Sequence, residues 1–253
     1  METKVQFQFM IAGVTLRVQC CCAGTRAVCG DFLVDDDTPA DAQIVITPED
    51  HEKERAFLLS KKRRGEDLEA STPEALERLV LCRRAAELLP RYGAVLFHGS
   101  ALALDGQGVL FTAASGTGKS THTALWRREI NGVEMVNDDK PFLRLQNDQI
   151  LVCGSPWMGK HRLGANISVP LKAICLLQRG EKNSIHPVTA REALPMLLQQ
   201  TYRNESPEML MHTLKIMDRV SSGTELYRLA CNMEPEAARV AARGIFMDRE
   251  ETL

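Results

Sequence analysis

A glycine-rich turn between an apolar strand and a helix is the feature that most restricts how this chain can fold. The run Ala113-Ala114-Ser115-Gly116-Thr117-Gly118-Lys119-Ser120 follows the apolar segment 109–112 and precedes a helical pattern over 119–129. Strand–loop–helix geometry points main-chain N–H groups inward at an electropositive helix N-terminus, which suits a polyphosphate. The pattern predicts a phosphate-binding (Walker A) loop; the alternative is a glycine turn that binds nothing.

The residues of this loop have separable expected roles. Lys119 reaches the β and γ phosphates of a nucleotide, and Ser120 is an expected Mg²⁺ ligand. Ala113 stands where the standard pattern has glycine. The expected nucleotide-binding residues are Ser115, Gly116, Thr117, Gly118, Lys119, Ser120 and Thr121.

Two acidic residues follow the next expected strand, over 133–136. Asp138 and Asp139 come about twenty residues after Lys119. A carboxylate at a strand end near a phosphate loop can hold Mg²⁺, and a second one can accept the proton of an attacking hydroxyl. The alternative is a solvated turn, because Asn137-Asp138-Asp139-Lys140-Pro141 has a turn-like composition.

Further polar residues are candidates for the same site. His98 ends the expected strand 94–98, which we expect to pair with the loop-bearing strand 109–112, so that His98 lies near the phosphates; a buried structural histidine is the alternative. Lys160, in the turn-rich segment 154–162, can neutralise charge on a transferred phosphoryl group; a surface hairpin is the alternative. Weaker candidates are His122, Trp157, Arg162, Gln200, Tyr202 and Arg203.

The pattern along the chain divides it into two parts. Residues 1–70 are expected to form a β-rich subdomain with strands over 6–11, 14–18 and 41–47, an Asp35-Asp36-Asp37 turn, and a charged loop or hairpin over 48–70. Residues 71–253 are expected to form the nucleotide-binding domain, beginning with a helix capped by Ser71. The expected later elements are hairpin 142–153, strands 173–177, 184–188 and 225–230, and helices 190–200, 206–220 and 235–246.

Composition excludes several classes of protein. The 253 residues are 44% hydrophobic and 25% charged with a net charge of −2, which predicts a soluble globular protein without a field that attracts nucleic acid or an anionic membrane. Apolar runs fall short of the roughly 20 residues that a spanning helix needs, and the start lacks a signal-peptide pattern. We therefore expect a cytoplasmic protein whose eight cysteines are thiols.

Four cysteines lie close together in the sequence: Cys20, Cys21, Cys22 and Cys29. They are either buried or incidental thiols or the ligands of a metal site. Adjacent residues on a strand point to alternating faces, which suits tetrahedral coordination poorly.

The motifs together resemble the catalytic core of HPr serine kinase/phosphorylase, which is related to phosphoenolpyruvate carboxykinase. Over 96–242 the chain is similar to HPr-kinase-related proteins of uncharacterised substrate, some of which accompany ribosomally made peptide pathways. The resemblance implies a mixed sheet with flanking helices, with Ser120 and Asp138 on Mg²⁺ and Asp139 as general base near His98. Ala113 departs from the family pattern, and the later signature loop of HPr kinase is not found. The matching stretches are 98–99, 111–122, 137–141 and 154–160.

These observations lead to one expected activity. The chain is expected to be a kinase that transfers the γ-phosphoryl group of ATP to a serine-like hydroxyl in a protein, peptide or small molecule. A nucleotide-binding switch or peptide-maturation scaffold without transfer is the main alternative, and a carboxykinase is the second. The choice between ATP and GTP is open, and a homo-oligomer is compatible with this interpretation.

Overall fold

The computed structural model describes residues 5–61 and 72–247. The chain divides into two compact units, Met1–Tyr92 and Gly93–Leu253. The boundary expected after residue 70 falls within residues 62–71, which lie outside the described residues. Helix α3 (Pro73–Leu88), which the sequence assigned to the second part, belongs to the first unit because it packs on α1 and α2 there.

The first unit contains the small sheet that the sequence predicted. Its strand order is β3-β1-β2-β4, and β1 and β2 form an antiparallel hairpin. The hairpin turns at Ala12 and Gly13, which both have positive φ, as a tight two-residue turn requires. Phe7, Phe9 and Leu16 fill the buried face. The strands are β1 (Val5–Ile11), β2 (Val14–Cys20), β3 (Leu33–Val34) and β4 (Ala42–Val45).

Three helices accompany this sheet, and one of them corrects a prediction. The charged segment expected to be a loop or hairpin forms α2 (Pro48–Lys61), while α1 (Ala23–Cys29) was not expected at all. The buried side of α2 is polar rather than apolar, so hydrophobic periodicity could not reveal it. Its acids pair with α3 instead, through Arg83–Glu54 at 2.7 Å and Arg84–Asp50 at 2.6 Å. Thr72 caps α3, and the expected cap Ser71 lies outside the described residues.

The second unit is built on a mixed sheet with strand order β5-β9-β10-β11-β7-β6-β8. The long strand β11 also pairs with β13, and β13 pairs with β12. Strands β7, β11 and β13 are parallel, and the other pairs are antiparallel. The mixed sheet with flanking helices is therefore confirmed. The strands are β5 (Ala94–Leu96), β6 (Ser100–Leu104), β7 (Gln107–Thr112), β8 (Glu134–Asn137), β9 (Phe142–Gln146), β10 (Gln149–Cys153), β11 (Ser168–Arg179), β12 (Ser184–Pro187) and β13 (Glu225–Cys231).

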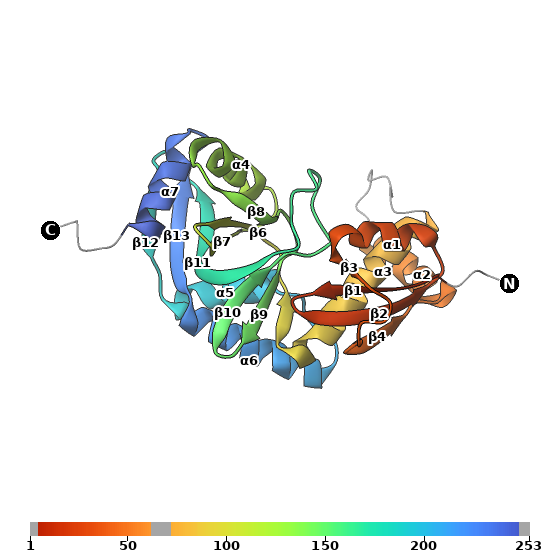
Figure 1. Cartoon of the computed structure of the whole chain (residues 1–253). Helices are drawn as coiled ribbons and strands as arrows, with labels where there is room; N and C mark the ends of the chain where they lie inside the picture. The colour runs from red at the N-terminus through yellow and green to blue at the C-terminus, as the bar shows by residue number, and fades with distance from the viewer. Residues whose placement is uncertain (1–4, 62–71, 248–253) are drawn as a thin grey trace. The chain divides into compact units, whose positions relative to one another are not determined.

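Helices cover both faces of this sheet (Figure 1). Along β7, Val109 and Phe111 join the core under α4 and α7, whereas Leu110 joins the core under α5 and α6. This alternation is what a strand with both faces buried must show, because successive side chains point to opposite faces. The helices are α4 (Lys119–Glu129), α5 (Ala190–Gln200), α6 (Pro207–Gly223) and α7 (Glu236–Phe246).

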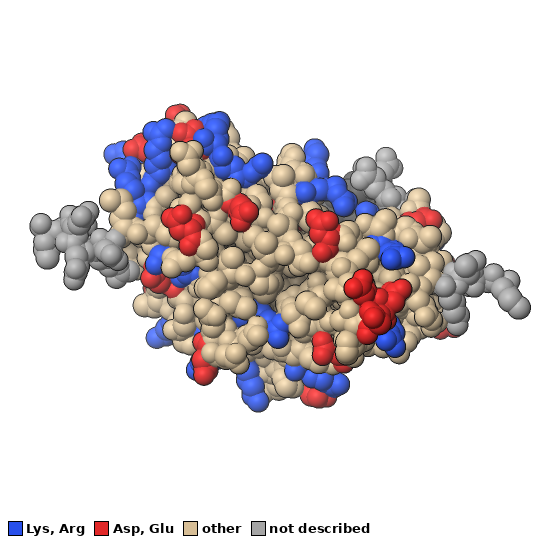
Figure 2. Space-filling model, in the orientation of Figure 1, with Lys and Arg blue, Asp and Glu red and all other residues tan. Residues whose placement is uncertain are grey.

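Basic side chains gather on the surface over α4 and α7, at the upper left of Figure 2. Arg127, Arg128, Arg239 and Arg243 contribute to this exposed patch. Glu129 neutralises part of it, through ion pairs of 2.8 Å with Arg128 and 2.6 Å with Arg239. The positive charge is therefore a feature of this patch, since the chain as a whole has a net charge of −2.

Two further expectations can be compared with the structure. All eight cysteines lie in the described residues, and none of them forms a disulfide there. Among the described helices, none combines the length and the apolar character that crossing a bilayer demands.

Candidate active site

Strand pairing brings the two predicted motifs to the same edge of the sheet. On β6, Ser100 lies opposite Phe111 of β7, and Ala101 lies opposite Asn137 of β8. Because β6 is antiparallel to both neighbours, β7 and β8 end beside the start of β6. The glycine-rich loop after β7 and the aspartates after β8 therefore leave the sheet at one edge, on either side of the segment that carries His98.

The glycine-rich loop adopts a conformation that its sequence makes accessible. Gly116 and Gly118 have φ of 78° and 122°, where a side chain would be strained. Lys119 begins α4, and its Nζ donates to the carbonyl oxygen of Ala113 at 3.1 Å, so the lysine folds back over the loop. The Ala113 methyl group is buried in the core under α4 and α7. The loop therefore accommodates alanine where the standard pattern has glycine.

The expected binding residues of the loop lie mostly at the surface. Ser115, Gly116, Ser120 and Thr121 are exposed, while Thr117, Gly118 and Lys119 are partly buried. Their exposure leaves the loop accessible to a ligand.

Asn137 organises the turn that holds the two aspartates. Its Oδ1 accepts from the main-chain N–H groups of Asp139 and Lys140 at 2.9 and 2.6 Å, and its Nδ2 donates to the carbonyl oxygen of Ser155 at 3.0 Å. Asp138 is 8% exposed, and its Oδ1 accepts from the N–H of Gly159 at 2.7 Å. The turn composition seen in the sequence is thus real, and the fold uses that turn to fix both carboxylates.

Asp139 faces three cationic or titratable groups. Its Oδ1 lies 3.5 Å from His98 Nε2, and its Oδ2 forms an ion pair with Lys140 Nζ. It also interacts electrostatically with Lys119. His98 Nδ1 lies 2.8 Å from Oε1 of Gln200, at the end of α5. The structure thus brings His98, Lys119 and Asp139 together. The strand pairing differs from the expected one: the segment expected to pair with the loop-bearing strand forms β5, which pairs with β9, and β6 is the strand that pairs with β7.

Burial and charge shift the pKa values of two of these groups. Partial burial lowers the pKa of His98 below 6.5, and the Lys119 charge lowers it further; Asp139 and the Gln200 hydrogen bond oppose the shift. Burial also lowers the pKa of Lys119, against the attraction of Asp139. A histidine that is largely neutral at pH 7 can accept a proton, so the site contains a base beside an acidic side chain.

The other sequence candidates divide between surface and core. Lys160 is exposed directly after Gly159, the residue that holds Asp138, and it makes no hydrogen bond or ion pair within the described residues. Trp157 is 8% exposed and packs on Phe142 at 6.2 Å between ring centroids, so it belongs to the core. His122 is 2% exposed; its Nε2 accepts from Trp126 Nε1 at 2.9 Å, and burial lowers its pKa to about 4.

A cavity of about 430 Å³ adjoins the loop. Gly116, Gly118 and Thr121 form one side, and Arg179, Asn232 and Met233, from the ends of β11 and β13, form another. Arg179 Nη2 donates to the carbonyl oxygen of Gly116 at 2.7 Å and joins the loop to β11. The cavity therefore lies beside the loop, on the side of the parallel strands β11 and β13.

Sequence reasoning gave little weight to the supporting residues. Gln200 was a weak candidate, and Lys140 and Asn137 were named only as parts of a turn-like run. Ser155 binds the carbonyl oxygen of Lys140 at 2.6 Å, and neither it nor Arg179 was singled out for a role. Only the Asn-Asp-Asp composition could have indicated the Asn137 turn. Gln200, Ser155 and Arg179 form hydrogen bonds with residues 15 to 102 positions away in the chain, and bonds between such distant positions leave no local pattern in the sequence.

Comparisons with known proteins were made with sequences, with solved structures and with family models. No curated protein sequence matches the chain. The solved structure described as "Structure of the Hpr(Ser) kinase/phosphatase from Coxiella burnetii" is 14% identical, with a TM-score of 0.35 and coverage of 59% of this chain and 95% of that chain. Nothing about the activity of this chain follows from so low a score.

The family model described as "SynChlorMet cassette protein ScmC" matches residues 70–249, well over half of the sequence. The chain therefore belongs to the ScmC family of SynChlorMet cassette proteins.

Proposed function

We propose that the second unit is a phosphotransferase that moves the γ-phosphoryl group of ATP to a hydroxyl acceptor. The observation that carries this proposal is the meeting of three side chains, Lys119, His98 and Asp139, at the sheet edge where the glycine-rich loop begins. The loop supplies donors for a polyphosphate, and the His98–Asp139 pair supplies a proton acceptor. The motif resemblance to HPr serine kinase agrees with this assignment.

The nucleotide is proposed to lie along the loop. Main-chain N–H groups of residues 116–120 and the start of α4 would cradle the phosphates, with Lys119 Nζ turning from Ala113 to the β and γ oxygens. The cavity beside Arg179 and Met233 has room for the nucleoside. Its open, partly apolar lining is compatible with either ATP or GTP.

The donor chemistry of the site fits Mg²⁺. The exposed hydroxyl of Ser120 and the carboxylate of Asp138 are oxygen ligands of the kind that Mg²⁺ prefers, and Gly159 engages only Oδ1 of Asp138. These two residues would hold the ion. When bound with the nucleotide, Mg²⁺ supplies charge neutralisation at the β and γ phosphates.

The acceptor hydroxyl is proposed to lose its proton to Asp139 or His98. The Gln200 amide oxygen accepts from His98 Nδ1–H, so in the neutral ring the lone pair is on Nε2, which faces Asp139. Lys140 engages the other Asp139 oxygen and orients the carboxylate. Lys119 and the exposed Lys160 would offset the negative charge of the transferred group.

The pH dependence of transfer is expected to follow His98. Its pKa is lowered in the fold, so the neutral ring persists below pH 6.5 and is lost only as the pH falls through the lowered value. We expect kcat/KM to be flat near pH 7 and to fall on an acid limb that lies below pH 6.5. His98→Gln should lower the rate and remove this limb. An identical acid limb in the variant would contradict the assignment.

The test of the proposed function is transfer from γ-labelled ATP. The full chain with Mg²⁺ would be offered free serine, serine-containing peptides and HPr, and product would be measured as acid-stable label on the acceptor. Calorimetry with ATP and GTP, with and without Mg²⁺, would measure binding alongside. Labelled acceptor supports the phosphotransferase. Tight Mg²⁺-dependent binding without labelled product would favour the nucleotide-binding switch, and absence of binding would contradict both.

A further inference from the structure

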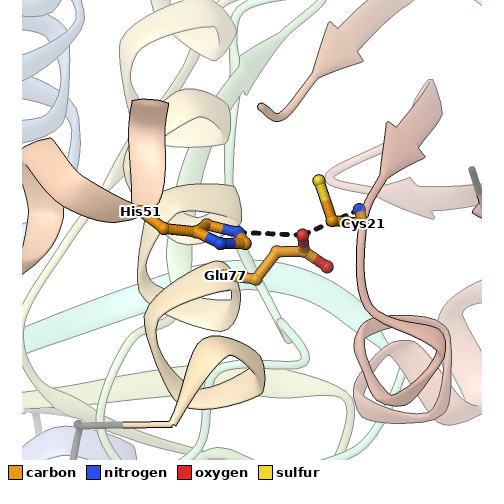
Figure 3. A group of neighbouring side chains, drawn as sticks. All are labelled: Cys21, His51 and Glu77. Atoms are coloured by element: carbon orange, nitrogen blue, oxygen red, sulfur yellow. Dashed lines mark hydrogen bonds and ion pairs between the residues drawn. The ribbon is translucent and has the colours of Figure 1, made fainter. Parts of the chain in front are cut away.

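A second group of chemically reactive side chains lies wholly within the first unit (Figure 3). Cys21 follows β2, His51 lies in α2 and Glu77 lies in α3. Cys21 and Glu77 are 56 positions apart in the chain, yet one ligand atom from each of the three residues lies within 4.8 Å of the others. The sequence alone showed adjacent cysteines without a nearby histidine, and the fold provides both the histidine and a carboxylate.

The group has the burial of a built site. The side chain of Glu77 is fully buried and that of His51 is 10% exposed. A buried carboxylate is costly unless positive charge or strong hydrogen bonds compensate it. Among the described residues, the ion-pair partner of Glu77 is His51, at 2.9 Å. Arg83 and Arg84 of α3 pair with other acids, Glu54 and Asp50.

The two oxygens of Glu77 have different surroundings. Oε1 accepts from Cys22 N–H at 2.9 Å and from the Thr25 hydroxyl at 2.5 Å. Oε2 accepts from Cys21 N–H at 2.8 Å and lies against His51 Nε2. The donors on Oε1 fix the carboxylate so that Oε2 faces the imidazole and the Cys21 residue. Hydrogen bonds of this kind are how proteins orient a carboxylate that ligates a metal.

We propose that this group is a zinc site, with Cys21 Sγ, His51 Nε2 and Glu77 Oε2 as ligands. The ion takes the place of the proton between His51 Nε2 and Glu77 Oε2. The Nε2 proton of the ion-paired ring is released to solvent, which leaves a neutral imidazole with its proton on Nδ1. The Cys21 thiol also releases its proton to solvent as the thiolate binds. One thiolate, one carboxylate and a neutral imidazole cancel the charge of a divalent ion, so the buried site has no net charge.

The donor set selects the class of metal. A thiolate and an imidazole suit borderline ions such as Zn²⁺, whereas Mg²⁺ and Ca²⁺ prefer oxygen ligands. Three protein ligands leave a fourth tetrahedral position for water or another ligand. The ion would join the turn after β2 to helices α2 and α3, and so stabilise a unit whose sheet and core are small. This proposal is independent of phosphotransfer in the second unit.

The experiment uses the full chain, purified with reductant and then equilibrated with Zn²⁺ or with Co²⁺ as a spectroscopic substitute. We expect about one zinc ion per chain by elemental analysis. With Co²⁺ we expect a sulfur-to-metal charge-transfer band, which the oxygen ligands near the phosphate loop cannot produce. Cys21→Ser should abolish the band, and both Cys21→Ser and His51→Gln should weaken zinc binding by more than about 100-fold.

Matched variants separate the site from general effects on folding. Cys82→Ala removes another buried thiol of the first unit and should leave uptake and the band unchanged. Thr25→Ala removes a supporting hydrogen bond and should weaken binding by about 10–100-fold. Circular dichroism would establish that each variant is folded. The proposal is overturned if the folded wild type takes up neither metal, or if the band and the affinity survive in Cys21→Ser; the group is then a hydrogen-bonded clamp only.

Discussion

Lys119→Ala is expected to lower phosphoryl transfer by about 10²–10³-fold and to weaken ATP binding markedly. The lysine begins α4, and its ammonium group folds over the loop onto the Ala113 carbonyl oxygen, from which it can turn to the phosphates. Removing it takes away the ammonium group that folds over the loop, while the buried strand and the glycine backbone stay in place. Calorimetry with ATP and Mg²⁺, together with transfer from γ-labelled ATP, would measure both effects.

Lys215→Ala is the matched control, since this exposed lysine of α6 has no part in the site. The control should bind ATP and transfer phosphate as the wild type does. If Lys119→Ala retained wild-type binding and turnover, the loop would have no role in nucleotide chemistry. A loss of folding, seen as a lowered melting temperature in Lys119→Ala alone, would instead require Lys119→Met, which keeps most of the aliphatic stem.

Asp139→Asn is expected to retain ATP binding while transfer falls by about 10²–10⁴-fold, the usual contribution of a general base. Asparagine keeps the shape of the side chain but cannot accept the proton of the acceptor hydroxyl. It also removes the ion pair with Lys140 and the attraction toward His98 and Lys119. Because Asp139 raises the pKa of His98, the remaining acid limb should move to lower pH in the variant.

The comparison variant is Lys140→Met, which removes the ion pair but leaves the carboxylate. If Asp139 is the base, Lys140→Met should retain far more transfer than Asp139→Asn. Equal losses in the two variants would mean that the ion pair, rather than proton acceptance, is what matters. Undiminished transfer in Asp139→Asn would assign the base to His98.

Local sequence patterns predicted those elements whose stability comes from their own periodicity. The apolar run 109–112 predicted β7, and the helical pattern after Lys119 predicted α4. Helix α2 was missed because its buried side carries Asp50, His51 and Glu54, each of which pairs with a charged side chain of α3. A polar face that packs on another polar face looks solvated in sequence.

The amino-acid sequence by itself determined the glycine-rich loop between β7 and α4, because the strand, the glycines, Lys119 and the helix follow one another without interruption in the chain. It also placed Asp138 and Asp139 at the end of a strand. Only the tertiary structure decided that β6 would bring His98 between these motifs and that Gln200, from α5, would bind its ring. The same holds for Cys21, His51 and Glu77. These groupings depend on strand pairing and helix packing between distant segments, and such contacts leave no local periodicity in the chain.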